Sequence, residues 1–405
     1  MSLLKRLSST KLRNSLRTDY PTNIIIGLYM RERAATFRVI IWSLLSILSL
    51  SSSAGMAGTG DRLVRDTTPL ETIDAAMTRQ LLLLDITAVG NRLIAVGEQG
   101  VILISDDQGE HWRQAKVPSS VLLTAVQFVD EQIGWAVGHD GVALQTVDGG
   151  ESWQLKLDGN QINQIRIHDL NSTIQQWDES RDNGDLTLED LEYALEDAQY
   201  ALEDGASVPL LDLWFIDRNT GYLAGAYGMF LQTRDGGKSW QSADHLLPNP
   251  DRFHLNAIYA TRNGDLYLAG EAGVLFKRDS FGSWTQLDTG YEGSFFALRE
   301  NEGHLNLMGL RGHLFRSQDG EQWAQVPLPT TSSITAGLSD TDGGLILIGQ
   351  GGLLLQQHNG NFQSLKAPTR TSFSSGVRVG QQLILVGEAG ITRVQLSNNP
   401  QGGRS

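Results

Sequence analysis

Short apolar runs separated by glycine-rich turns follow one another from about residue 82 to residue 396. Seven of these runs end in the same Gly-x-x-Gly turn, and another apolar run follows each turn. The first glycines of successive turns are 41, 87, 45, 39, 40 and 38 residues apart, so the pattern repeats about every 40 residues. The turns begin at Gly97, Gly138, Gly225, Gly270, Gly309, Gly349 and Gly387.

The first repeat predicts four short antiparallel strands. We expect them over Leu82–Val89, Arg92–Val96 and Val101–Ser105, and from Trp112 onward. Units of this kind are the blades of a β-propeller when they are arranged radially, and neighbouring blades cover each other's faces. The sequence therefore predicts an all-β, seven-bladed β-propeller. We attribute the repeated glycines to tight turns that need a positive φ.

A polar turn of the form Ser/Thr-x-Asp-x-Gly-x-x-Trp, the Asp-box, follows the third strand of several repeats. It is complete in repeats 1 to 3, one residue shorter in repeat 5, decayed in repeats 4 and 6, and missing from repeat 7. Identical residues at equivalent turns indicate a structural rather than a catalytic role, with the carboxylate accepting backbone N–H groups and the tryptophan packing between blades. These residues are Asp107, Asp148, Asp235 and Asp319 with Trp112, Trp153, Trp240 and Trp323.

Repeat 7 ends early, because a polar tail over residues 397–405 follows its third apolar run. An open strand edge in a closed ring is prone to unwanted pairing. We therefore predict that the segment Asp61–Gln80 supplies the fourth strand and closes the ring. The propeller would then occupy residues 58–396.

Residues 1–57 have the features of an export signal. Arg31, Arg33 and Arg38 precede the apolar run Val39–Leu50, and small residues follow as far as Ala57. A basic region, a short apolar region and a small-residue exit make up a secretory signal, so we expect cleavage near Ala57 and a periplasmic or exported protein. The alternatives are an uncleaved inner-membrane anchor and a natural start at Met30.

Charge and composition exclude several functions. The chain has no cysteine, which excludes disulfides, thiolate metal sites, a catalytic thiol and a lipid anchor on cysteine. The net charge is −14, and because residues 1–41 carry +6, residues 58–405 carry −20. A body this acidic repels nucleic acid and anionic lipid, so neither is an expected partner.

The doubled spacing contains an insertion over residues 158–207, between blades 2 and 3. Residues 158–204 hold 13 Asp/Glu and two Arg, a net charge of −11. Thr187 and Asp190 resemble a capping box and Gly205 is a helix stop, so we predict an acidic helical hairpin. Asp182–Asp185 resembles part of a calcium loop, but Arg181 would occupy a ligand position, so no metal is expected. The helices' apolar stripes are Ile162, Ile165, Leu170, Ile174 and Trp177, and Leu188, Leu191, Leu195, Ala198 and Leu202.

Strand order places the Gly-x-x-Gly turns and the connections between blades on one face, with the Asp-box turns on the other. The hairpin is such a connection, so we expect it to overhang the glycine-turn face. Variable residues on fixed turns form a natural docking surface. The partner-binding candidates are Glu98, His139, Asp140, Tyr227, Glu271, Arg311, Gln350 and Glu388 in the turns, with Glu189, Glu192 and Glu196 in the hairpin.

The inner strands contain the few candidates for catalysis. Asp85 and Asp212 lie at equivalent positions, and two carboxylates are what glycoside hydrolysis needs. We also place Arg299 and Arg378 at positions equivalent to each other. A sialidase-like or other glycoside hydrolase is therefore the alternative function, although the arginine triad and Arg-Ile-Pro of sialidases are missing. His254 and His304 are expected to be structural or surface residues, and no cofactor is expected.

The repeats, best seen from Val137 to Trp153, resemble the photosystem II assembly and stability factor family over roughly residues 82–396. This resemblance implies a non-catalytic seven-bladed propeller that assists the assembly of membrane complexes from the non-cytoplasmic side. The missing anchor cysteine and the acidic hairpin depart from that family and favour a non-photosynthetic bacterial relative. We therefore expect a scaffold, monomeric outside its complex, that binds a membrane protein or complex, with an exporter as one candidate partner.

Overall fold

The computed structural model describes residue 78 and residues 81–178, 187–279, 282–340 and 343–396. The chain divides into two compact units, Met1–Thr59 and Gly60–Ser405, and the described residues all belong to the second. They form seven antiparallel sheets, numbered 1 to 7 here in chain order, with strands in sequence order within each sheet. Among the described residues, no helix has the length and apolar character needed to cross a membrane.

The first four sheets have four strands each. Sheet 1 contains β1 (Leu83–Val89), β2 (Arg92–Gly97), β3 (Ile102–Ser105) and β4 (Arg113–Gln114); sheet 2 contains β5 (Leu123–Phe128), β6 (Gly134–Gly138), β7 (Ala143–Thr146) and β8 (Gln154–Leu157). Sheet 3 contains β9 (Leu210–Phe215), β10 (Gly221–Gly225), β11 (Phe230–Thr233) and β12 (Gln241–Ser242); sheet 4 contains β13 (Leu255–Ala260), β14 (Leu266–Gly270), β15 (Leu275–Arg278) and β16 (Trp284–Gln286).

The last three sheets continue the pattern, but the seventh has three strands. Sheet 5 contains β17 (Phe295–Asn301), β18 (His304–Gly309), β19 (Leu314–Ser317) and β20 (Ala324–Val326); sheet 6 contains β21 (Ile334–Ser339), β22 (Leu345–Gly349), β23 (Leu353–His358) and β24 (Asn361–Ser364). Sheet 7 contains β25 (Phe373–Val379), β26 (Gln382–Gly387) and β27 (Gly390–Gln395). The segment Asp61–Gln80, predicted to supply the closing strand, lies outside the described residues except for Thr78.

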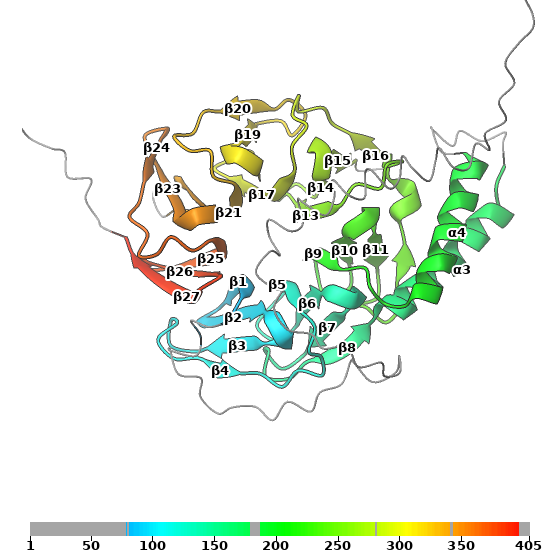
Figure 1. The fold of residues 1–405 in the computed structure, drawn as a ribbon, viewed down its shortest axis with the longest axis horizontal. Coiled ribbons are helices and arrows are strands. Elements are labelled where there is room, and N and C mark those ends of the chain that lie inside the picture. Colours follow the sequence, from blue (N-terminus) through cyan, green and yellow to red (C-terminus); the bar gives the residue numbers. More distant parts are fainter. Residues whose placement is uncertain (1–77, 79–80, 179–186, 280–281, 341–342, 397–405) are drawn as a thin grey trace, which may run out of the picture. The chain divides into compact units, whose positions relative to one another are not determined.

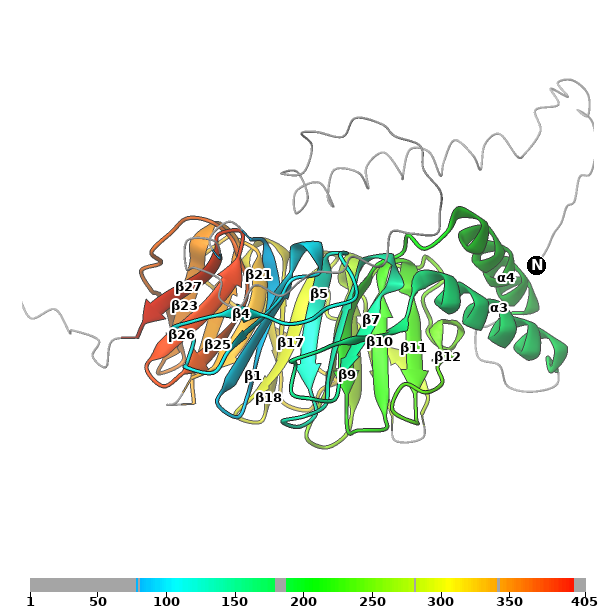
Figure 2. The same ribbon diagram turned by 90° about the horizontal axis from the view of Figure 1, so that it is seen from below.

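The sheets stand around a common centre, as in a β-propeller (Figure 1). The first strand of each sheet lies beside the first strand of the next, and β25 of sheet 7 lies beside β1 of sheet 1. Seen from the side, the sheets stand next to one another with their strands running between the two faces (Figure 2). Successive residues of a strand point to opposite faces of its sheet, and a neighbouring sheet covers each face. Both sets of side chains are therefore buried, which explains the continuous apolar runs of the sequence.

The two glycines of each Gly-x-x-Gly turn serve different purposes. Gly97 has an extended backbone, with φ at −176°, and a Cβ there would lie 2.1 Å from the carbonyl oxygen of Leu82. Gly100 has a φ of +68°, and a Cβ would lie 1.9 Å from the carbonyl oxygen of Ser119. Our attribution of both glycines to a positive φ is thus wrong for the first one. Glycine is needed there because the backbone at Leu82 leaves no room for a Cβ. In six turns the residue before the second glycine is also left-handed, as at Gln99, Asp140, Tyr227, Ala272, Arg311 and Gly351.

The aspartates of the polar turns hold their own loops. The Asp148 carboxylate accepts hydrogen bonds from the Thr146 hydroxyl at 2.7 Å and from the backbone N–H of Ser152 at 3.0 Å. Asp107, Asp235 and Asp319 make the same pattern of bonds. Each carboxylate is therefore engaged within its turn, as expected for a structural residue.

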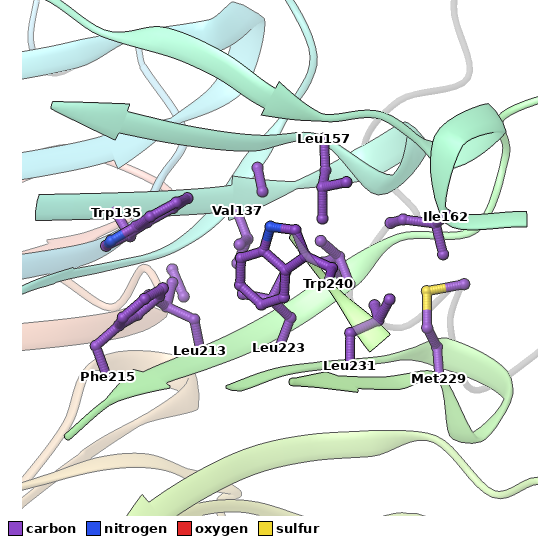
Figure 3. Close-up of a cluster of buried hydrophobic side chains, with 13 residues drawn as sticks. Trp135, Val137, Leu157, Ile162, Leu213, Phe215, Leu223, Met229, Leu231 and Trp240 are labelled. Carbon is purple, nitrogen blue, oxygen red and sulfur yellow. The ribbon is translucent and has the colours of Figure 1, made fainter. Parts of the chain in front are cut away.

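The tryptophan that follows each complete polar turn packs against the preceding sheet. Trp240 meets Trp135 of sheet 2 edge-on, with ring centroids 5.8 Å apart, and Trp135 stacks on Phe215 of sheet 3 at 4.6 Å (Figure 3). Trp153 and Trp112 lie in the equivalent clusters between sheets 1 and 2 and between sheets 7 and 1. Trp323 is only partly buried against the cluster between sheets 4 and 5. These rings supply much of the apolar contact between sheets.

Two antiparallel helices form the predicted hairpin, α3 (Gly159–Gln175) and α4 (Leu188–Asp204). Asp158 and Gln161 form a capping box on α3, and Thr187 and Asp190 form the predicted one on α4. Gly205 ends α4 with a φ of +90°. The calcium-like segment Asp182–Asp185 lies outside the described residues, and the described residues contain no group of acidic or histidine side chains placed to hold a metal.

The hairpin lies along the rim of the ring beside sheet 3 (Figure 1). Asp169 of α3 accepts the backbone N–H of Ser242 in the outermost strand β12 at 2.8 Å, and buried Arg166 donates to Asp244 at 3.0 Å. The hairpin thus extends along the perimeter, although α3 begins beside the glycine turn of sheet 2, so the expected overhang on that face stays a prediction. The exposed edge of β12 needs hydrogen-bond partners, and α3 supplies one, which keeps the hairpin at the perimeter.

Candidate functional site

The glycine-turn face contains two kinds of predicted binding residue. In the first kind, a glutamate follows the first glycine and binds the start of its own sheet: Glu98 accepts from the Leu82 N–H at 2.9 Å, and Glu388 from the Ser372 N–H at 3.0 Å. Glu271 makes the equivalent bond with His254 N–H at 3.5 Å. Each of these three carboxylates therefore bonds its turn to the backbone at the start of the same sheet. The sequence analysis did not predict this role.

The second kind occupies the left-handed position, where the side chain leaves the turn. Asp140, Tyr227 and Arg311 have φ values of 56°, 55° and 56°. Tyr227 is 56% exposed, and Arg311 is also exposed. His139 and Gln350 precede this position and are half-buried; burial lowers the pKa of His139, which keeps it neutral near pH 7. The side chains at the left-handed position therefore differ in chemistry from turn to turn.

A small cluster joins the glycine turns of sheets 3 and 4. The ring of Tyr227 lies edge-on to His254, with centroids 4.9 Å apart, and His254 Nδ1 lies 3.4 Å from a Glu271 carboxylate oxygen. Burial lowers the pKa of His254 and raises that of Glu271. His254 is a structural residue, as expected, and it positions the exposed tyrosine.

Asp85 and Asp212 lie at equivalent positions of β1 and β9, the innermost strands of sheets 1 and 3. Asp85 accepts the N–H of Val126 in sheet 2 at 2.9 Å, and Asp212 accepts the N–H of Ile258 in sheet 4 at 2.8 Å. Burial raises the pKa of both carboxyls, that of Asp212 to about 7. Each therefore bridges its sheet to the next one.

Comparable side-chain bonds link the other neighbouring inner strands. They show that polar residues hold together strands that have no backbone pairing with each other. Thr124 donates to Leu210 O at 2.8 Å, Asn256 to Phe295 O at 2.9 Å, Arg299 to Gly337 O at 3.3 Å and Thr335 to Phe373 O at 2.8 Å, while Ser375 of sheet 7 bonds to Asp85 of sheet 1.

The two inner-strand arginines are not equivalent, contrary to our expectation. Arg299 pairs in register with Asn306, whereas Arg378 pairs with Leu383, and the residue equivalent to Arg299 is Val377. Shifting by one residue moves a strand side chain to the opposite face. Arg378 accordingly forms an ion pair with Asp340 of sheet 6. The inner strands therefore carry bonds between sheets, and the two arginines that we expected at equivalent positions lie on opposite faces of their sheets.

The fold is that of a β-propeller. Side chains of its inner strands bond each sheet to the next, and side chains that differ from repeat to repeat lie in the glycine turns on one face. The chain belongs to the family of the photosynthesis system II assembly factor YCF48, whose model matches residues 104–177 and 192–352, more than half of the chain. Named members of this family are photosystem II assembly factors. The match includes residues of both hairpin helices and is interrupted only between residues 177 and 192. We expected the whole hairpin to differ from the family, but the unmatched part is shorter than the hairpin.

Named proteins that resemble this chain belong to the same family. The photosystem II assembly lipoprotein Ycf48 of Synechococcus sp. (strain CC9902) is 26% identical over 178 residues, 42% of this chain and 50% of the relative. The chain thus spans about half the length, or less, of the curated relatives it matches. A solved structure of YCF48 bound to D1 peptide superposes with a TM-score of 0.57 at 16% identity, covering 84% of this chain and all of that one. YCF48 from Cyanidioschyzon merolae gives 0.55 at 14% identity, covering 81% and 99%. At these identities the structures establish a shared fold.

Proposed function

We propose that this chain is an exported scaffold that binds a membrane protein, or a membrane complex under assembly, and assists its assembly or stability. The observation that carries this proposal is membership of a family of assembly factors, one of which has been solved bound to a peptide of D1. The basic and apolar pattern of residues 31–57 supports export, with cleavage near Ala57. An exporter is one candidate partner, and the scaffold is monomeric outside its complex.

The proposed scaffold is a seven-bladed propeller with Asp-box turns, completed by a strand from Asp61–Gln80. The contact of β25 with β1 supports this closure, as does the presence of three strands, and not four, in sheet 7 among the described residues. The partner would bind the glycine-turn face through Asp140, Tyr227 and Arg311. The Asp-box face is less suited, because its carboxylates are engaged within their own turns.

A pull-down from detergent-solubilised membranes tests the proposal. The bait is the tagged chain, recovered from the periplasm, with N-terminal sequencing to locate the cleavage site. We expect to recover one integral membrane partner. The Val147→Ala variant, changed on the Asp-box face, should still bind this partner. The double variant Tyr227→Ala and Arg311→Ala, changed on the glycine-turn face, should not. A partner retained equally by both variants would reject this face, and a cytoplasmic location of the intact chain would reject export.

A further inference from the structure

Two tyrosines stand on the outer face of α4 although the inner face of the helix is already packed. Leu191 and Ala198 are fully buried against α3, whereas Tyr193 and Tyr200 are each 58% exposed. The tyrosines are seven residues apart, which places them two turns apart on one side of the helix. Large aromatic side chains gathered on one exposed face are typical of an interaction surface.

Carboxylates surround these rings. Helix α4 has seven Asp/Glu and neither lysine nor arginine. Glu189, Glu192, Glu196 and Glu203 are exposed, and the hydroxyl of Tyr193 donates to Glu189 at 3.3 Å. The face therefore combines the negative charge and the electron-rich ring surfaces that attract a cation.

Helix α4 also contacts the propeller close to a third exposed tyrosine, Tyr227. Asp197, which lies between the two tyrosines in sequence, forms an ion pair with Arg252 in the connection between sheets 3 and 4. Arg252 lies beside Gly228, the residue that follows Tyr227. A Cβ added at Gly228 would lie 3.5 Å from the Arg252 Cα. Tyr227 is itself 56% exposed and keeps a left-handed backbone that a bulky residue rarely adopts. We call Tyr193, Tyr200 and Tyr227 with Glu189, Glu192, Glu196 and Glu203 the aromatic–acidic surface.

We propose that the aromatic–acidic surface binds an arginine-rich segment of the partner protein. This inference rests on the proposed scaffold function and names the chemistry of the partner at this place. A guanidinium group pairs with a carboxylate through two hydrogen bonds and also stacks on an aromatic ring, so arginine uses both features of the surface, whereas lysine uses them less well. The charge of the surface disfavours anionic lipid and nucleic acid as the occupant.

Fluorescence anisotropy with synthetic peptides tests this proposal on the full chain. The probe is a peptide of about 16 residues with arginine at every third or fourth position, spaced to match one helix face. We expect binding that weakens with added salt, about 10-fold loss of affinity for Tyr193→Ala with Tyr200→Ala, and near-retention for the matched Tyr→Phe pair, which keeps both rings. The charge-removing pair Glu192→Gln and Glu196→Gln should also weaken binding, and Val147→Ala on the Asp-box face should not.

Three outcomes would overturn the proposal: equal affinity for a peptide with glutamine in place of arginine, no binding of the arginine peptide, or no effect of the Tyr→Ala pair. Tyrosine-dependent binding to neutral phosphatidylcholine vesicles without arginine-peptide binding would assign the surface to a membrane instead. The membrane pull-down separates the two proposals. A partner retained while the arginine peptide fails leaves the scaffold function standing and removes this inference.

Discussion

Arg393 in the last sheet donates to Glu110 in the first sheet at 2.6 Å, although 283 residues separate them in sequence. Glu110 follows the glycine of its polar turn. Glu151 and Glu321 occupy the same place in sheets 2 and 5, and they pair with Arg113 and Lys277 of the preceding sheets. The junction of the two ends of the ring therefore repeats a contact used between internal sheets.

The apolar contact at this junction should contribute more stability than the ion pair. Ile384 of sheet 7 is fully buried in the cluster it forms with sheet 1, and Ile104 is fully buried between sheets 1 and 2. We expect Ile384→Ala and Ile104→Ala each to lower the free energy of unfolding by about 2–5 kcal/mol in urea titrations. Arg393→Ala should change it little, because solvent screens an exposed pair. A much smaller loss for Ile384→Ala than for Ile104→Ala would show that the ring closes loosely.

Substitution of the first glycine of a turn should be far more damaging than substitution at the left-handed position of another. A Cβ at Gly97 would lie 2.1 Å from a backbone oxygen, whereas Gly351 has nothing within 4 Å and corresponds to Ala272 in sheet 4. We expect Gly97→Ala to lower the free energy of unfolding by more than about 2 kcal/mol and Gly351→Ala by about 1 kcal/mol or less. Equal losses in thermal unfolding would contradict this explanation of the turns.

The polar turns should lose their contribution to stability in acid. Hydrogen bonds from the His111 backbone, and then from its side chain, lower the pKa of Asp107 to about 2, below the ordinary 3.8. The folded state therefore favours the ionised carboxylate, and its contribution is complete above about pH 4 and is lost as the pH falls toward 2. Asp107→Asn should lower the urea midpoint at pH 7, and the difference from the natural chain should shrink between pH 4 and 2. A constant difference would refute this linkage.

Asp212 should have the opposite dependence. Burial raises its pKa to about 7, so the folded state favours the protonated carboxyl. Its contribution to stability is complete below about pH 4 and decreases as the pH rises through 7. Asp212→Asn removes this titration but replaces an oxygen that accepts an N–H, so it should destabilise the chain more at pH 5 than at pH 8. Carbon NMR of the carboxyl group provides a direct measurement, and an ordinary value near 4 would contradict the prediction.

The sequence by itself determined the repeats, the polar turns and the helical hairpin. Each of these depends on residues close together in the chain, such as the capping pair Thr187 and Asp190, whose spacing alone specifies their geometry. The equivalence of Asp85 and Asp212 was also predicted, and each lies two residues after the leucine that pairs with the first glycine of its sheet's turn.

Only the tertiary structure decided what lies between the sheets and around the rim. The partner of Asp85 is a backbone N–H of sheet 2, and the place of the hairpin depends on the Asp169 bond to the edge strand β12. The inner strands of neighbouring sheets share no backbone ladder, so no periodicity in the sequence reports their mutual register. The mismatch of Arg299 and Arg378 is different, because the sequence already places them ten and nine residues before their glycines. Local patterns specify a strand and its turn, but the side chains that meet across two sheets depend on how those sheets pack.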